Sequence, residues 1–172
     1  VTECWDAIGS GTGETITYVN GAANITAQSF AGFKAIGVAS GDGETSDGGL
    51  TAAESEALAG READIAAFVN GGGGLLVFAQ DFDDATTSNY AFLGGFGSLT
   101  FTTELGYEFI APTAAGEAIG ITDALDISAW HDVYLTFPTF LNVLATNDDS
   151  EDEGFGEVAA LGGANVVIGP EE

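Results

Sequence analysis

The hydrophobic pattern is most regular in the centre of the chain, where two apolar stretches flank a helical repeat. The stretch FKAIGVAS (33–40) is almost entirely apolar, which is typical of a strand covered on both faces. Thr51 and Glu54 predict a capping box at the start of a helix that ends at Gly71. The apolar positions that recur at helical spacing are Leu58, Ile65, Phe68 and Val69. GLLVFAQ (74–80) follows as a second buried strand, so this order predicts a βαβ unit with parallel strands.

The pattern before this unit is less regular. Residues 1–14 are rich in Gly and Thr and predict an irregular N-terminal segment. TITYVN (15–20) alternates and carries β-forming residues, so it predicts a short strand. ITAQSFAGF (25–33) fits a helical turn, but its pattern leaves the assignment open.

Strands dominate the pattern toward the C-terminus. SLTFTTELGYEFI (98–110), LNVLAT (141–146) and GEVAALGGANVVIG (156–169) are rich in β-forming residues and predict strands. The acidic loop NDDSEDEGFG (147–156) predicts a hairpin or sheet-edge connection between the last two.

These elements predict an α/β fold in a single domain over residues 1–172. The core is expected at 15–169, with a short tail at 170–172. We expect an open, mostly parallel sheet with flanking helices, of flavodoxin-like character, with antiparallel additions toward the C-terminus.

The charge of the chain limits its partners. There are 27 Asp and Glu residues against Lys34 and Arg61 alone, so the formal net charge is −25. Such self-repulsion destabilises a compact state unless salt or divalent cations such as calcium screen it. Nucleic acid and anionic lipid are excluded as partners, because binding phosphates requires bases. No membrane span is expected either, since the longest uncharged run, 85–103, is rich in Thr, Ser and Gly.

Residue usage at the N-terminus bears on location. The chain has no methionine, so we expect it to begin after a processing step such as the removal of a secretory signal. Asn24 and Thr26 form an N-glycosylation sequon. We expect a secreted or cell-surface protein, and a halophilic cytoplasmic origin stays open because such proteins are similarly acidic.

Several of these stretches resemble the class I glutamine amidotransferase-like superfamily. They are FKAIGVAS, GGLTAAESEALAGREADIAAFVNGGGGLLVFAQ, ITDALDISAW, LNVLAT and GEVAALGGANVVIG. More narrowly, the chain is similar to amidotransferase-like domains of exported bacterial proteins, some of which carry a PEP-type C-terminal sorting tail. The terminal GPEE lacks the hydrophobic span and basic end of such a tail.

The chain departs from the catalytic members of that superfamily. Their strand after the helix ends in a Gly-x-Cys-x-Gly elbow, and a later His-x-Glu completes the triad. Here the elbow position falls on Ala79 or Gln80, and the sole histidine, His131, precedes Asp-Val. The resemblance therefore implies the scaffold without the amidotransferase chemistry. A pair of Cys4, the sole cysteine, with His131 is a remaining nucleophile and base, against the alternative of an inert thiol and a structural histidine.

Two acidic clusters are candidate calcium sites, because calcium takes about six to eight oxygen ligands. The preferred cluster follows the strand 74–80, at the sheet edge where α/β proteins bind ligands, and consists of Asp81, Asp83 and Asp84. The second cluster lies in the late acidic loop and includes Asp149, Glu151 and Glu153. Neither spacing matches an EF-hand, and a solvated acidic face is the alternative interpretation of both.

Together these features predict a non-catalytic, exported structural protein of the cell surface or extracellular matrix that self-assembles into a filament or layer. The glycine-rich stretch FLGGFGSLTF (92–101) is a candidate subunit contact or core segment. Two alternatives stay open. One is a hydrolase of the same superfamily with a relocated or calcium-assisted site at Asp81, Asp83 and Asp84. The other is a calcium- or sugar-binding module that binds surface polysaccharide.

Overall fold

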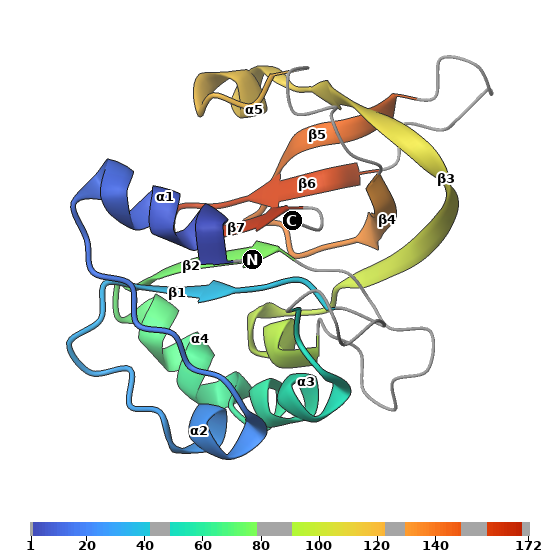
Figure 1. Ribbon diagram of the computed structural model, residues 1–172. Helices are drawn as coiled ribbons and strands as arrows, with labels where there is room; N and C mark the ends of the chain where they lie inside the picture. The colour runs from blue at the N-terminus through green and yellow to red at the C-terminus, as the bar shows by residue number, and fades with distance from the viewer. Residues whose placement is uncertain (1, 42–48, 79–90, 123–129, 149–157, 170–172) are drawn as a thin grey trace.

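The computed structural model of the chain describes residues 2–41, 49–78, 91–122, 130–148 and 158–169. Its helices are α1 (Thr2–Thr12), α2 (Ala22–Ala27), α3 (Ala52–Ala59), α4 (Glu62–Asn70), α5 (Ala114–Ala118) and the 3₁₀ helix η1 (Ala91–Phe96). Its strands are β1 (Ala35–Val38), β2 (Gly74–Phe78), β3 (Thr100–Pro112), β4 (Trp130–Thr136), β5 (Asn142–Asp148), β6 (Val158–Gly162) and β7 (Val166–Gly169). Figure 1 shows α2, α3 and α4 gathered on one side of β1 and β2, with α1 on the other side.

The sheet is open and mixed. In the described part of the chain it has seven strands in the order β1-β2-β7-β6-β4-β3-β5. β1, β2 and β7 are parallel neighbours, whereas every pair among β3, β4, β5, β6 and β7 is antiparallel. The long, curved β3 pairs with β4 along its first part and with β5 at its end (Figure 1). The expected α/β class with an open sheet is confirmed, but the expectation of a mostly parallel sheet is wrong.

The predicted βαβ unit is present. β1 and β2 are adjacent and parallel, and the chain between them forms α3 and α4. The backbone N–H of Glu54 donates to the Thr51 hydroxyl at 3.4 Å, and the Thr51 N–H donates to the Glu54 carboxylate at 2.9 Å. These two reciprocal hydrogen bonds confirm the capping box at the start of α3.

The single helix expected over this region is divided into two. The chain turns at Gly60 and Arg61, between α3 and α4. Gly60 lowers the helix propensity of this point. The Arg61 N–H donates to the Leu58 carbonyl at 2.8 Å, which is the tighter spacing of a 3₁₀ turn. Gly71 ends α4 as predicted.

The main hydrophobic core lies between the sheet and the helices α3, α4 and η1. Three of the predicted apolar positions, Leu58, Ile65 and Val69, are buried in it, and Phe68 packs against it half-buried. The strands contribute Val38, Leu75, Val77, Val166 and Ile168. A smaller cluster, on the β3–β5 side of the sheet, contains Ile110, Leu144, Ala145 and Ala160.

β1 is less covered than its apolar sequence predicts, because it is the outermost strand. Val38 is buried and Ile36 is half-buried, but Ala35 is exposed. Gly37 faces the side of the sheet opposite to Val38, since strand residues alternate, and there the ring of Trp5 lies against it.

The N-terminal residues differ most from the prediction. The segment expected to be irregular, 1–14, contains α1, whose Trp5 ring meets the Phe78 ring edge-on with centroids 5.4 Å apart. Gly and Thr lower helix propensity, but packing of an aromatic side chain on the sheet stabilises the helix. The predicted strand at 15–20 has neither helical nor strand structure. α2 overlaps the first part of the ambiguous stretch 25–33.

Three C-terminal stretches form strands as predicted, one of them divided in two, whereas β4 was not predicted. β3 and β5 confirm the strands expected at 98–110 and 141–146. The stretch 156–169 forms an antiparallel hairpin of β6 and β7, in which Gly163 N–H donates to the Val166 carbonyl at 2.6 Å. β5 and β6 also pair antiparallel, as the predicted hairpin requires, while residues 149–156 of the connection lie outside the described ranges.

Candidate functional site

The carboxyl edge of the parallel strands is where the sequence places its preferred calcium site. Val38 aligns with Val77, and Phe78 aligns with Gly169, so the three parallel strands end side by side. β2 is the middle strand of the three. The residues predicted for the site and for the elbow follow Phe78 and lie outside the described ranges; they are Asp81, Asp83, Asp84, Ala79 and Gln80.

The second predicted cluster also falls beyond what the structure describes. Asp149, Glu151 and Glu153 follow Asp148, the last residue of β5. Among the described residues, no three His, Cys, Asp or Glu side chains come together in an arrangement that could hold a metal ion. Both calcium sites therefore stay predictions.

The pair of Cys4 and His131 also stays a prediction. Cys4 lies on α1 with its side chain exposed. His131 belongs to β4, next to Trp130, whose backbone aligns with Glu108 of β3. The imidazole of His131 is not among the described side chains.

A cluster that the sequence did not indicate joins α1 to the coil that follows it. The Tyr18 hydroxyl donates to Asp6 Oδ1 at 2.7 Å and lies 3.1 Å from the Thr2 carbonyl oxygen. The hydrogen bond to Asp6, together with desolvation and the charges of Asp6 and Cys4, raises the pKa of Tyr18 to about 12. A hydroxyl with such a pKa is poorly matched to proton transfer near neutral pH. The cluster therefore fixes the coil to the helix and offers little as a reactive centre.

Arg61 is occupied by structural contacts. Its Nε donates to Asp64 Oδ2 at 2.7 Å, and its Nη1 donates to the carbonyl oxygens of Ile25 at 2.6 Å and Thr26 at 3.2 Å. The guanidinium carbon lies 4.4 Å from the centroid of the Phe30 ring. Arg61 thus satisfies carbonyl groups at the end of α2 and links that helix to α4.

Lys34, the other base, pairs with Glu14 on the surface. Both bases of the chain are therefore engaged with its own groups. None of the helices in the described ranges has the length and apolar character needed to cross a lipid bilayer.

The carboxylate of Glu54 joins the start of α2 to the start of α3. Its carboxylate accepts hydrogen bonds from Thr51 N–H, the Thr51 hydroxyl and Gly21 N–H, the last at 2.6 Å. Burial raises the pKa of Glu54, but these hydrogen bonds outweigh it and lower the pKa overall. The carboxylate is therefore held ionised as a cap for α3 and an anchor for the start of α2.

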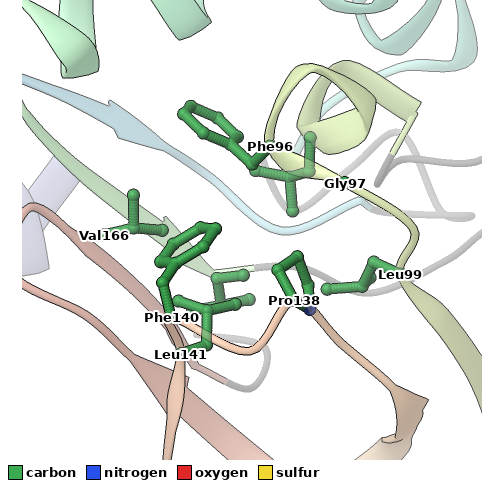
Figure 2. A pocket seen from close by; sticks show the side chains of 9 residues that line it. Phe96, Gly97, Leu99, Pro138, Phe140, Leu141 and Val166 are labelled. Carbon is green, nitrogen blue, oxygen red and sulfur yellow. The ribbon is translucent and has the colours of Figure 1, made fainter.

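An apolar hollow opens beside η1, and Figure 2 shows its side chains. Phe96 and Leu99 approach it from η1 and the chain that follows, and Pro138 and Phe140 approach from the segment between β4 and β5. The rings of Phe96 and Phe140 are 6.4 Å apart. The free space is about 10 Å³, roughly the room for one water molecule. The hollow is therefore too small for a substrate, although Phe140 is 48% exposed at its mouth.

The stretch FLGGFGSLTF supplies half of this hollow. Phe92 and Leu93 are buried in the main core, whereas Phe96 and Leu99 stand half-buried around the hollow. The core role expected of the stretch is therefore confirmed for Phe92 and Leu93, and its role as a subunit contact stays a prediction.

A second, open and polar hollow of about 270 Å³ lies between the coil after α1 and α2. Its lining residues are Thr17, Tyr18, Val19, Asn20, Asn24, Ala27 and Gln28. The Asn24 amide already donates to the Asn20 carbonyl at 2.8 Å, and the Thr26 hydroxyl donates to the Ala22 carbonyl at 2.8 Å. The sequon is exposed on α2, and none of the lining side chains is charged.

The chain matches no family model, no curated protein and no solved structure among those compared with it.

Proposed function

We propose that this chain is a non-catalytic structural domain of the cell surface or extracellular matrix, which self-associates into a filament or layer. The observation that carries the proposal is the apolar hollow. It is nearly filled by its own side chains, so it takes no substrate, yet it leaves Phe140 exposed at its mouth. Aromatic side chains are enriched in protein interfaces, so Phe140 with the half-buried Phe96 beside it suits a contact between proteins.

The charge sets the conditions for association. Copies with a formal net charge of −25 repel one another, and the repulsion between exposed charges falls when salt shortens the Debye length from about 30 Å at 10 mM to about 3 Å at 1 M. Calcium screens acidic surfaces in the same sense and binds carboxylates directly. The proposal therefore requires surroundings rich in salt or calcium, a condition that a location at the cell surface or in the extracellular matrix can meet.

The scaffold belongs to the same proposal. A βαβ unit followed by a third parallel strand is compatible with a flavodoxin-like, amidotransferase-like domain. The antiparallel strands that complete the sheet would then be an elaboration of it. In this proposal the domain has lost the Cys and the His-x-Glu of the catalytic members and serves as a building block.

Electron microscopy of the 172-residue chain tests the proposal. Protein dialysed into about 1 M NaCl, where the Debye length is about 3 Å, or into calcium is expected to form ordered polymers. Phe140→Ser is expected to weaken them, while Ile119→Ser, which alters an exposed apolar residue at the end of α5, away from the hollow, serves as the control. Isolated particles in every condition would overturn the proposal.

Calcium binding is a second candidate function. It is favoured by the position of β2, because the Asp81 group follows the middle strand of the parallel set. If calcium binds there, a chelator lowers the melting temperature and Asp81→Ala abolishes that difference. The same variant tests the hydrolase alternative, since esterase, amidase or glycosidase turnover lost with Asp81 would contradict a non-catalytic domain. Unchanged melting curves with calcium, chelator and polysaccharide would exclude a binding module.

A further inference from the structure

The outer edge of β1 is open to pairing. Gly74 N–H donates to the Lys34 carbonyl at 2.9 Å, which directs that carbonyl toward β2. Because backbone groups alternate sides along a strand, the N–H and C=O groups of Ala35 and Gly37 face away from β2. In the described ranges β1 pairs with β2 alone, and both residues are exposed. Such an edge is a template for another strand.

A strand-forming segment that is not part of the sheet lies close in the sequence. TITYVN (15–20) is rich in residues that favour strands, yet it forms no strand in a single copy. Thr15, Thr17 and Tyr18 are exposed. Within one copy of the chain, the strand propensity of this segment is therefore not satisfied by pairing with another strand.

The segment belongs to an N-terminal arm, which we define as residues 2–20. The arm has internal contacts of its own: Glu14 N–H donates to the Gly9 carbonyl at 3.0 Å, and Tyr18 bonds to Asp6. It meets β1 and β2 through Trp5, which lies on Gly37 and Phe78, and through the pair of Glu14 with Lys34. The arm is thus a unit with its own internal bonds, held to the sheet edge by a ring contact and an ion pair.

Within one copy, both ends of the segment are tied. Glu14 pairs with Lys34 before it, and Gly21 N–H donates to Glu54 after it. Val19 also packs against the main core. These ties hold the segment off the edge of β1. If the arm docks on another copy, Glu14 pairs with Lys34 of that copy, while Gly21 still bonds to Glu54 of its own copy. The two contacts then no longer hold the segment away from a β1 edge.

The charges of Glu14 and Lys34 define one register in which the segment 15–20 of one copy can pair with β1 of another copy. Glu14 directly precedes the segment, and Lys34 directly precedes β1. A parallel alignment with Glu14 beside Lys34 places Ile16 beside Ile36, and it sets both on the same face of the sheet. Lys34 and Arg61 are the two bases of the chain, and the Arg61 side chain is only 12% exposed. Lys34 is therefore the cation at which an arm of this acidic chain can dock.

We infer that the outer edge of β1 is an assembly surface that takes the N-terminal arm of a second copy. The inference rests on the proposed self-association and adds an interface at β1 to the one at Phe140. The contacts of Trp5 and Glu14 are regained on the neighbour, and the segment 15–20 gains the strand pairing that it lacks. Each copy offers one arm and one edge, so the arm of each copy can dock on the next copy, and this head-to-tail contact builds an open filament when its rotation does not close into a ring.

Charge exchange between copies tests this inference. Lys34→Glu alone and Glu14→Lys alone each place like charges together, and each is expected to raise the protein concentration needed for assembly up to about tenfold. In an equimolar mixture of the two variants, the glutamate introduced at position 34 meets the lysine introduced at position 14 of a neighbour. The native Lys34 of one variant likewise meets the native Glu14 of the other. Only an interface between copies restores assembly to the wild-type concentration on mixing.

The edge itself is tested by Ala35→Pro, which removes an N–H that faces away from β2, with Ala35→Val as the matched control. Loss of polymers with proline and their retention with valine are expected. If wild-type protein forms no polymer, the proposed function fails and this inference fails with it. If wild-type protein polymerises but mixing restores nothing, this inference alone is overturned. The mixing experiment still tests this inference if Ala35→Pro unfolds the protein, because neither charge variant alters a residue of β1.

Discussion

The indole ring of Trp5 rests directly on the backbone of Gly37, so that a β-carbon added to Gly37 would lie 2.3 Å from Trp5 Cζ3. The same ring meets Phe78 edge-on. This contact joins α1 to the edge strand and its neighbour, and it exists only because residue 37 has no side chain. The N-terminal helix is therefore held on the sheet by a close approach that a single methyl group would remove.

Gly37→Ala tests that contact. The added methyl group displaces the Trp5 ring, and we expect the free energy of unfolding to fall by about 1–3 kcal/mol, the usual cost of overpacking. Chemical denaturation followed by circular dichroism and tryptophan fluorescence measures the change. Gly11→Ala is the control, because nothing lies within 4 Å of its added β-carbon and alanine raises helix stability by roughly 0.5–1 kcal/mol. Equal effects of the two variants would show that Trp5 does not hold the helix.

Glu54→Gln tests the junction of α2 and α3. The carboxylate accepts from Thr51 and Gly21, so near neutral pH we expect a loss of about 1–2 kcal/mol in the free energy of unfolding. Glu117→Gln, on the exposed surface of α5, is the control and is expected to change little.

The variant Glu54→Gln also tests how the free energy of unfolding depends on pH. The pKa of Glu54 is lower in the folded chain, so its contribution is present above the unfolded-state pKa and is lost as the pH falls through the folded-state value. The stability difference between wild type and Glu54→Gln should therefore shrink on acidification. A difference that grows with acid would contradict the assigned hydrogen bonds.

Tyr18 offers a spectroscopic test of the arm. Its pKa is raised to about 12, mainly by the hydrogen bond to Asp6. In Asp6→Asn we expect the phenol to ionise at lower pH, and ultraviolet titration with Tyr18→Phe as the reference isolates its signal. Because the pKa is raised on folding, this group stabilises the arm below the unfolded-state pKa and ceases to do so as the pH rises through the folded-state value. An unchanged Tyr18 titration in Asp6→Asn would contradict the contact.

Arg61 and Lys34 should differ sharply in how much each contributes to the free energy of unfolding. Arg61 has a side chain only 12% exposed and satisfies carbonyls at the end of α2, so Arg61→Met should cost about 2 kcal/mol in the free energy of unfolding. The Lys34 side chain is 77% exposed, and Lys34→Met in the monomer should cost less than about 1 kcal/mol. Thermal or chemical denaturation of dilute protein measures both. Similar losses for the two variants would contradict the role given to Arg61.

The central βαβ unit could be predicted because several local signals agree there. Thr51 and Glu54 define the start of the helical region, and Leu58, Ile65 and Val69 define its buried face. The apolar run after Gly71 has the length and composition of a buried strand. Local pattern and tertiary structure point the same way, which is the condition under which sequence is informative.

The N-terminal arm could not be predicted, because long-range packing outweighs its local preferences. α1 contains Gly9 and Gly11, yet Trp5 finds a complementary surface at Gly37, thirty-two positions further along the chain. The segment 15–20 has the sequence of a strand but forms none within one copy. The apolar hollow could not be predicted for a similar reason, since Phe96 and Phe140 are far apart in the sequence and come into contact only in the folded chain. The predicted acidic sites fall on residues outside the described ranges, and they stay predictions.

Sedimentation velocity of the wild-type chain across a salt series tests the central proposal most directly. At about 10 mM NaCl, where the Debye length is about 30 Å, repulsion between copies should keep the protein monomeric. At about 1 M NaCl, with a Debye length of about 3 Å, we expect large, fast-sedimenting polymers. A single monomeric boundary at every salt concentration, with and without calcium, would contradict a self-assembling structural protein.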